Sequence, residues 1–127
     1  MNTPSTGLQT LKAGFFRALA HPVRIRLLEA LVASGEMSVR DLQRRLRIDQ
    51  PIVSQQLARL RAGGIVVSTK QGSSTRYAVA DPMIGDLLRV ARTILNRHLA
   101  GVNTLRRELA RDEAATRRRP LSRHASP

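Results

Sequence analysis

The sequence predicts a mainly α fold with one small β-hairpin. Only 2% of the residues are aromatic and there is no Trp, so the core must be built from Leu, Val, Ile and Ala, which pack well between helices. Apolar residues recur at helical spacing along most of the chain, whereas a single pair of β-prone runs flanks a short polar turn. With 127 residues and 42% hydrophobic content, the chain has material for one compact core.

Two helices are predicted in the first third of the chain. Residues 1–7 are mostly polar and contain Pro, Ser and Thr, which predicts a mobile N-terminal arm. Between Leu8 and Ala20 the apolar residues recur at helical spacing, so we expect a first helix there. His21 and Pro22 interrupt this pattern. Pro22 is tolerated in the first turn of a second helix, which we expect to end near Gly35.

A pair of helices joined by a short turn follows. Ser38 can cap the first of them, and Asp41 stands three residues later, where a capping box usually has Glu or Gln. Residues 47–50 are predicted to form the turn. Asp49 is the expected cap of the second helix, and Pro51 lies in its first turn.

The second helix of this pair has two different faces. At about 100° per residue, Val53, Leu57 and Leu60 lie within a narrow arc that we expect to be buried. The opposite side is small and polar, and it carries Ser54, Gln55, Ala58, Arg59 and Ala62.

A β-hairpin and a long helix complete the predicted domain, which we place at residues 8–109. Gly63 and Gly64 end the preceding helix, and the β-prone runs 65–70 and 75–79 are joined by a polar turn. A helical pattern then continues from Met83 to about Leu109. Residues 110–127 contain several arginines and few apolar residues, and are predicted to be a basic disordered tail.

Charge and element order together indicate a DNA-binding protein. The chain carries 22 Lys and Arg against 9 Asp and Glu, a formal net charge of +13 that favours a polyanionic partner. Two helices and a hairpin in this order are typical of a winged helix-turn-helix, which places its second helix in the major groove. There Gln can pair with adenine and Arg with guanine, while cations around them hold phosphates. The predicted DNA-binding residues are Arg40, Arg44, Gln50, Ser54, Gln55, Gln56, Arg59, Arg61, Lys70, Ser73, Ser74 and Arg76; Arg45 and Arg47 would also lie near phosphates.

The last helix predicts a homodimer. Its apolar residues spread over about half the circumference, wider than the roughly 100° stripe that packing on one core requires. With apolar residues of the first helix they would form an isologous two-fold interface, which implies an inverted-repeat operator. The predicted interface residues are Leu8, Leu11, Phe15, Met83, Leu87, Val90, Ile94, Leu95 and Leu99.

Four segments carry a resemblance to a known family. They are residues 18–28 (ALAHPVRIRLL), 36–42 (EMSVRDL), 50–57 (QPIVSQQL) and 60–66 (LRAGGIV). In this order they closely resemble the ArsR/SmtB family of bacterial repressors, and the likeness covers about residues 8 to 100. The resemblance implies a homodimeric winged-helix repressor that leaves its operator when an inducer binds.

The chain departs from this family at the positions where relatives hold metals. Metal-sensing relatives have cysteines in a motif similar to Glu-Leu-Cys-Val-Cys-Asp-Leu, and this chain has Ser38 and Arg40 there. It contains no Cys at all, so disulfides and thiol sensing are excluded. We therefore expect no metal or other cofactor, although a nitrogen- or oxygen-based metal site that uses His98 and partner-chain groups remains an alternative. The positions of the second family site fall on Asp81, Met83, Ile94 and Arg97, of which only Asp81 is a possible ligand.

Other functional classes have less support. No Ser/His/Asp set or carboxylate pair has a catalytic setting, and Gly63-Gly64 lacks a phosphate-loop pattern, so we expect no enzyme. RNA binding would need more aromatic residues for stacking. A winged-helix protein-interaction module, or a regulator controlled by a partner protein, is the alternative. The sequence has neither a spanning apolar stretch nor a signal pattern, so we expect a cytoplasmic repressor of its own operon, released by a signal that the sequence does not identify.

Overall fold

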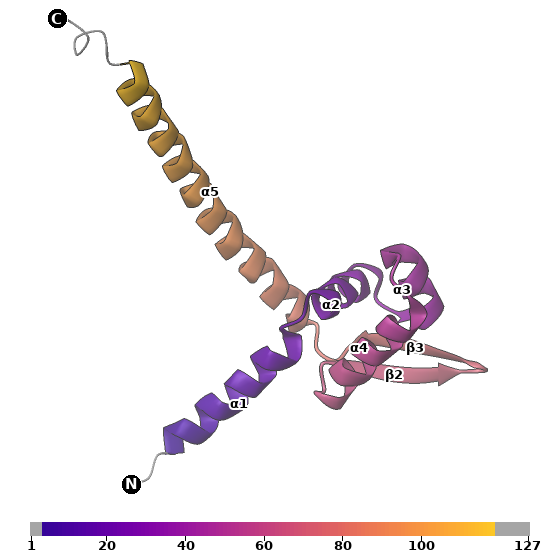
Figure 1. Ribbon diagram of the computed structural model, residues 1–127. Helices are drawn as coiled ribbons and strands as arrows, with labels where there is room; N and C mark the ends of the chain where they lie inside the picture. Colours follow the sequence, from indigo (N-terminus) through magenta and orange to yellow (C-terminus); the bar gives the residue numbers. More distant parts are fainter. Residues whose placement is uncertain (1–3, 119–127) are drawn as a thin grey trace, which may run out of the picture. The chain divides into compact units, whose positions relative to one another are not determined.

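The computed structural model describes residues 4–118. The chain divides into two units, Met1–Leu88 and Arg89–Pro127, and the last helix begins in the first unit and continues through the second. The predicted domain over residues 8–109 crosses this division and stays a prediction. In chain order the elements are α1 (Pro4–Leu19), α2 (Pro22–Ser34), β1 (Met37–Ser38), α3 (Val39–Leu46), α4 (Gln50–Ala62), β2 (Val66–Gln71), β3 (Ser74–Val79) and α5 (Met83–Arg118) (Figure 1).

The outer ends of α1 and α5 differ from the prediction. Helix α1 begins at Pro4 rather than Leu8, because Pro is tolerated in a first helical turn, where backbone N–H groups have no helical partner. Helix α5 continues past Leu109 to Arg118. Its last turns are rich in Arg, Glu and Ala, which favour helix, and Arg117 pairs with Glu113 at 3.2 Å. The predictions of an arm over 4–7 and a tail over 110–118 are therefore wrong, and residues 1–3 and 119–127 lie outside the described residues.

The ends of α2 are fixed by backbone capping. His21 precedes the helix in an extended conformation, and its Nδ1 accepts a hydrogen bond from the Val23 N–H at 3.1 Å. Pro22 occupies the first turn, as predicted. At the other end Gly35 has a φ of 88°, which favours glycine, and its N–H donates to the Leu31 carbonyl at 2.7 Å.

The hairpin belongs to a three-stranded antiparallel sheet with the order β1-β3-β2. Strands β2 and β3 form the predicted hairpin, with Val66 opposite Val79 and Gln71 opposite Ser74. Gly72 has a φ of 62° in the connecting turn. The two-residue strand β1 was not predicted, because two residues carry no detectable periodicity. It pairs with the side of β3 that β2 leaves open.

The core of the first unit is built from aliphatic side chains, as expected. The predicted inward-facing residues of α4, Val53, Leu57 and Leu60, are all 0% exposed. Burial of each such side chain contributes roughly 1.5–3 kcal/mol. One face of α4 is therefore held against the rest of the unit. The other fully buried side chains are Leu27, Leu28, Leu31, Leu42 and Val66.

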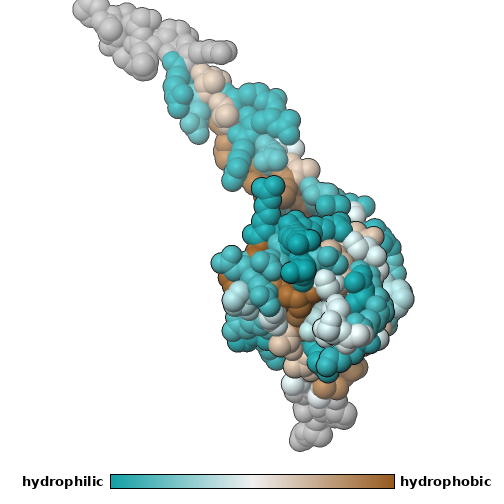
Figure 2. Space-filling model, turned by 90° about the vertical axis from the view of Figure 1, so that its right-hand side faces the viewer, coloured by the Kyte–Doolittle hydropathy of each residue, from teal (hydrophilic) through white to brown (hydrophobic). Residues whose placement is uncertain are grey.

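In its described residues, 89–118, the second unit consists of the continuation of α5. Most of its large apolar residues are more than half exposed in the single chain, with Ile94 at 59% and Leu109 at 53%, whereas Val102 is half-buried. Figure 2 shows hydrophobic and hydrophilic side chains sharing the surface of this helix. No helix between residues 4 and 118 has both the length and the apolar character needed to cross a bilayer.

The packing of α4 can be tested by removing one of its buried side chains. Leu57→Ala should lower the free energy of unfolding by about 2–5 kcal/mol, because it removes apolar contacts and leaves a cavity. Ile52→Ala is the matched control on the same helix, because Ile52 is 41% exposed. Urea denaturation at one fixed protein concentration measures both values. Equal losses for the two variants would show that α4 does not bury the Leu57 face.

Candidate nucleic-acid interface

Helices α3 and α4 are joined by a tight turn that sets their geometry. Arg47 ends α3 in the left-handed conformation, with φ 55° and ψ 46°. It is the one non-glycine residue with positive φ among residues 4–118. Arg26 from α2 donates from Nη2 to the Leu46 carbonyl at 2.8 Å and satisfies an open end of α3.

The capping predictions for these two helices have different outcomes. Ser38 caps α3 as predicted, since its Oγ accepts a hydrogen bond from the Asp41 N–H at 3.1 Å. Asp49 occupies the cap position of α4, but its side chain makes no capping hydrogen bond. The start of α4 instead relies on Pro51 in its first turn.

The outward face of α4 is polar and small, as its sequence predicted. Gln55 and Arg59 are exposed, and Ser54 is half-buried. Ala58 and Ala62 add little bulk on this side, so another surface can approach the helix closely. The side of the first unit on which α3 and the hairpin tip lie is largely hydrophilic (Figure 2).

Gln56 is not on this face, and its predicted role at the DNA is wrong. Its side chain is 7% exposed, and its Oε1 accepts a hydrogen bond from Arg24 Nε at 2.8 Å. The same Arg24 donates from Nη1 to the Ala18 carbonyl at 3.0 Å, so it connects α2 with α4 and with the end of α1. The helical period already places Gln56 beside Val53 and Leu60, a signal that the sequence prediction missed.

A polar groove lies between the beginnings of α3 and α4 and the hairpin. Its volume is about 560 Å³. It brings together four predicted residues, Arg40, Gln50, Ser73 and Ser74. Hydroxyl, amide and guanidinium groups in such a groove can donate hydrogen bonds to phosphate oxygens. The residues of the groove that were not predicted are Ser38, Val39, Gln43, Thr75 and Tyr77. Gln43 could have been found, because it lies three residues after Arg40 on the same helix face.

Most of the predicted cations around this surface are exposed. One of the neighbouring arginines, Arg45, instead donates to the Ser34 hydroxyl of α2. The others make no hydrogen bond or ion pair with residues in the described part of the chain, which leaves their charges available to a partner. They are Arg40, Arg44, Arg47, Arg59, Arg61 and Lys70.

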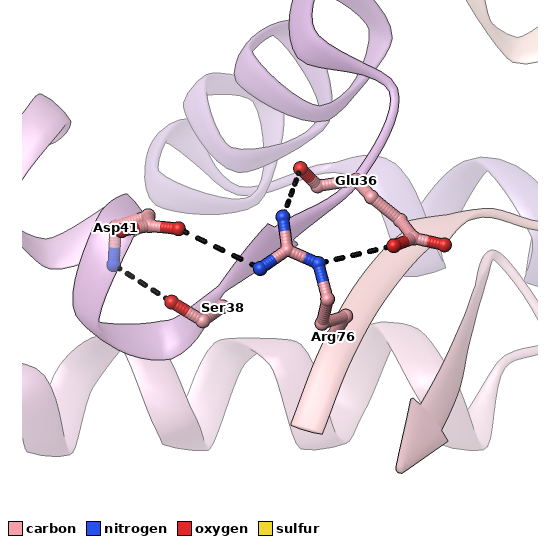
Figure 3. Close-up of polar contacts among 4 residues, drawn as sticks. All are labelled: Glu36, Ser38, Asp41 and Arg76. Atoms are coloured by element: carbon pink, nitrogen blue, oxygen red, sulfur yellow. Dashed lines mark hydrogen bonds and ion pairs between the residues drawn. The ribbon is translucent and has the colours of Figure 1, made fainter. Parts of the chain in front are cut away.

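Arg76 differs from these cations. It lies within β3 rather than at the hairpin tip, and its guanidinium is turned towards the corner where β1 meets α3 (Figure 3). Its Nε lies 3.0 Å from Glu36 Oε1, and its Nη2 donates to the Glu36 carbonyl at 3.1 Å. Its Nη1 lies 3.9 Å from Asp41 Oδ2. The sequence prediction that Arg76 binds DNA did not foresee these contacts, because Glu36 and Asp41 are far from Arg76 in the sequence.

The predicted dimer residues are mostly exposed in the single chain. On α1, Leu8 is 53% and Leu11 is 74% exposed. Leu87 is the exception, since it packs against the core of the first unit. That these predicted interface residues pair with a second chain stays a prediction. The other exposed residues of the set are Phe15, Met83, Val90, Ile94, Leu95 and Leu99.

The described residues show no ready-made metal site within one chain. No group of three or more His, Cys, Asp or Glu side chains between residues 4 and 118 is arranged to hold a metal ion. His98 is exposed on α5, so the alternative that combines it with groups of a partner chain stays a hypothesis.

Comparison with known proteins connects this geometry with bacterial gene regulators. The model of the family "Bacterial regulatory protein, arsR family" matches residues 21–68. The HTH-type transcriptional regulator Rv0081 of Mycobacterium tuberculosis is 42% identical over 96 residues, which cover 76% of this chain and 84% of the relative. The biofilm growth-associated repressor of Xylella fastidiosa is 37% identical over 82 residues, 65% of this chain and 71% of the relative.

Solved structures of bacterial transcriptional regulators resemble this chain as well. The crystal structure of Rv0081 matches with a TM-score of 0.68 and covers 79% of this chain and 97% of that chain. The transcriptional repressor BigR from Xylella fastidiosa matches with a TM-score of 0.63 at 33% identity, over 74% of this chain and 96% of that chain. The fold is thus a winged helix-turn-helix, with α3 and α4 as the helix pair and β2 and β3 as the wing.

The hydrogen bond between Arg24 and Gln56 generates a stability test. Gln56→Ala should lower the free energy of unfolding by about 1–3 kcal/mol, because it leaves the Arg24 Nε without its acceptor. The neighbouring Gln55→Ala removes the same amide from an exposed position and should stay within about 0.5 kcal/mol of wild type. Chemical denaturation of both variants measures the difference. A Gln56→Ala protein as stable as Gln55→Ala would argue against a structural role for this contact.

Proposed function

Because this chain belongs to the arsR family of bacterial regulatory proteins, we propose that it is a sequence-specific, double-stranded DNA-binding repressor that acts as a homodimer. The observation that carries the proposal is the division of α4 into two faces. Val53, Leu57 and Leu60 are fully buried, while Gln55 and Arg59 are exposed on a side with little bulk. A helix anchored in this way presents a fixed set of polar groups to base edges.

Helix α4 is the proposed reading helix. Gln55 can form two hydrogen bonds with an adenine edge, and Arg59 can form two with a guanine edge. Ser54 can donate to or accept from either base type. These contacts would give the protein its sequence preference.

The cations and the polar groove would hold the DNA backbone. Arg40 and Gln50 on one wall of the groove, and Ser73 and Ser74 on the other, supply donors at the place where the hairpin meets the helix pair. Lys70 on the hairpin adds an exposed charge. The net charge of +13 adds attraction that does not depend on sequence.

Exposed apolar residues of α1 and α5 support the homodimer. Leu11 is 74% exposed and Ile94 is 59% exposed, which is unfavourable for side chains that face water permanently. A second copy of the chain provides the same residues, so a two-fold axis could cover both sets at once. Two reading helices related in this way would fit an inverted-repeat operator with half-sites about one DNA turn apart.

The names of the relatives support the cellular role that we propose. They are named as transcriptional regulators and repressors, which are not enzymes, and we propose the same for this chain. The sites of action would be the cytoplasm and the operator of the protein's own operon. A signal that releases the repressor would complete the regulation.

The reading helix can be tested with one substitution on its exposed face. Arg59→Ala should weaken binding to the DNA upstream of the protein's own coding sequence by about 1–3 kcal/mol, because a base or phosphate contact is lost. Arg92→Ala removes an exposed arginine from α5 and is the matched control. Fluorescence anisotropy with this duplex and with a random duplex measures both affinities. If the wild type binds neither duplex at moderate salt, the chain is a protein-interaction module instead.

The homodimer can be tested on the apolar face of α5. Leu95→Glu should convert the dimer to a monomer, because it places a charge in the proposed apolar interface. Asn96→Glu introduces the same charge at the next residue, about 100° further round the helix and outside the apolar arc, and should leave the dimer intact. Analytical ultracentrifugation distinguishes the two states. Footprinting should show two protected half-sites for wild type and Asn96→Glu; a single half-site bound by a wild-type monomer would contradict the proposal.

A further inference from the structure

Arg76 joins the wing to the helix pair through three contacts. It lies in β3, the central strand of the sheet, where its backbone is paired with Ser38 of β1 and Thr69 of β2. Its guanidinium reaches the side chain and the carbonyl of Glu36, just before β1, at 3.0 and 3.1 Å. It also lies 3.9 Å from the carboxylate of Asp41 in the first turn of α3. Figure 3 shows Arg76 between these two acidic residues.

The positive charge of Arg76 is already more than compensated within the chain. Two carboxylates face one guanidinium, so the cluster as a whole carries no positive charge to offer a phosphate. Three of the guanidinium nitrogens face Glu36 and Asp41. Lys70 of β2 is different, since its exposed ammonium makes no contact with the described residues that would compete with a phosphate.

This cluster lies beside the polar groove. Ser38, which caps α3, is part of one wall, and Ser74 and Thr75 of β3 are part of the other. Arg76 belongs to β3 and holds the residues on both sides of Ser38. Its contacts therefore connect the two walls and limit how far the wing can move away from α3.

We infer that Arg76 is a positioning residue of the wing: it fixes β3 against the corner of β1 and α3, so that the groove is formed before DNA arrives, and it does not itself bind phosphate. The inference rests on the proposed function, since it assigns the groove to the DNA backbone. A wing fixed in advance loses less conformational freedom on binding, which increases affinity.

A substitution of Glu36 tests the inference, because the two possible roles of Arg76 predict opposite changes in DNA affinity. If Arg76 contacted phosphate, Glu36 would only repel the DNA, and Glu36→Gln would strengthen binding. If Arg76 positions the wing, Glu36→Gln replaces an ion pair with a weaker neutral hydrogen bond, loosens the anchor and weakens binding, although the protein becomes more positive. The two roles therefore predict opposite signs for one substitution.

The experiment compares Arg76→Gln, Arg76→Lys, Glu36→Gln and the Arg76→Gln/Glu36→Gln double variant, with Lys70→Gln as the matched control in the same hairpin. Affinity for the duplex upstream of the protein's own coding sequence is measured over a series of salt concentrations. Amide hydrogen exchange over residues 66–79 is measured on each full-length protein without DNA. The exchange measurement reports the anchoring of the wing whether or not DNA binds.

For the Arg76 variants, the expected result is a change in affinity without a change in salt dependence. Arg76→Gln should bind about tenfold more weakly with an unchanged salt slope, whereas Lys70→Gln should reduce that slope by about one. Glu36→Gln should also bind more weakly, the double variant should be no weaker than Arg76→Gln, and Arg76→Lys should recover part of the loss. Hydrogen exchange in the hairpin should become faster in Arg76→Gln and Glu36→Gln but not in Lys70→Gln.

Two results would overturn the inference. One is a reduced salt slope for Arg76→Gln together with tighter binding by Glu36→Gln, which would make Arg76 a phosphate ligand. The other is unchanged hydrogen exchange in both variants, which would show that the cluster does not anchor the wing. If wild-type protein bound no duplex at all, the proposed function would fail, while the exchange data would still decide the anchoring.

Discussion

The rotation of α4 about its own axis is the constraint on which the rest of the structure depends. A turn of roughly 100° would exchange one set of outward side chains for another, so the identity of the exposed residues is a property of the buried ones. Val53, Leu57 and Leu60 are inaccessible to solvent and leave α4 one favourable orientation. The apolar core of this chain thus specifies a polar surface, and a loss of packing beneath α4 would disturb recognition before it abolished folding.

Hydrogen bonds fix the position of α4 more closely than apolar packing alone can. Aliphatic side chains tolerate small slides and rotations, whereas the hydrogen bond from Arg24 to Gln56, at 2.8 Å, has a defined length and direction. Arg24 also contacts the Ala18 carbonyl at the end of α1. A displacement of α1 in the first unit would therefore change the position of the Arg24 guanidinium and, through it, the hydrogen bond to α4.

The sequence predicted those parts of the fold and site whose signals are local. The periodic apolar residues predicted the helices, and the polar turn predicted the hairpin. The interruption at His21-Pro22 and the cap at Ser38 predicted two helix starts. Gln56 was predicted to contact DNA although the helical period places it beside Val53 and Leu60, because polar residues are usually expected at the surface. The contacts of Arg76 could not have been predicted, since its partner Glu36 is 40 residues away and only the pairing of β1 with β3 brings them together. The extension of α5 to Arg118 was missed because charge suggested disorder where helix-forming residues prevail.

Arg47 places a charge between α3 and α4 in a backbone conformation that is unfavourable for its residue type. Glycine or asparagine adopts the left-handed conformation more easily, and a longer side chain there costs about 1 kcal/mol. That local penalty is partly offset, because a residue other than glycine also restricts the unfolded chain. The guanidinium of Arg47 is therefore attached to a backbone that is held in the turn between α3 and α4, unlike an arginine on a long flexible segment. When this group meets an anion, the side chain loses freedom but the backbone that carries it does not, which reduces the entropic cost of the contact.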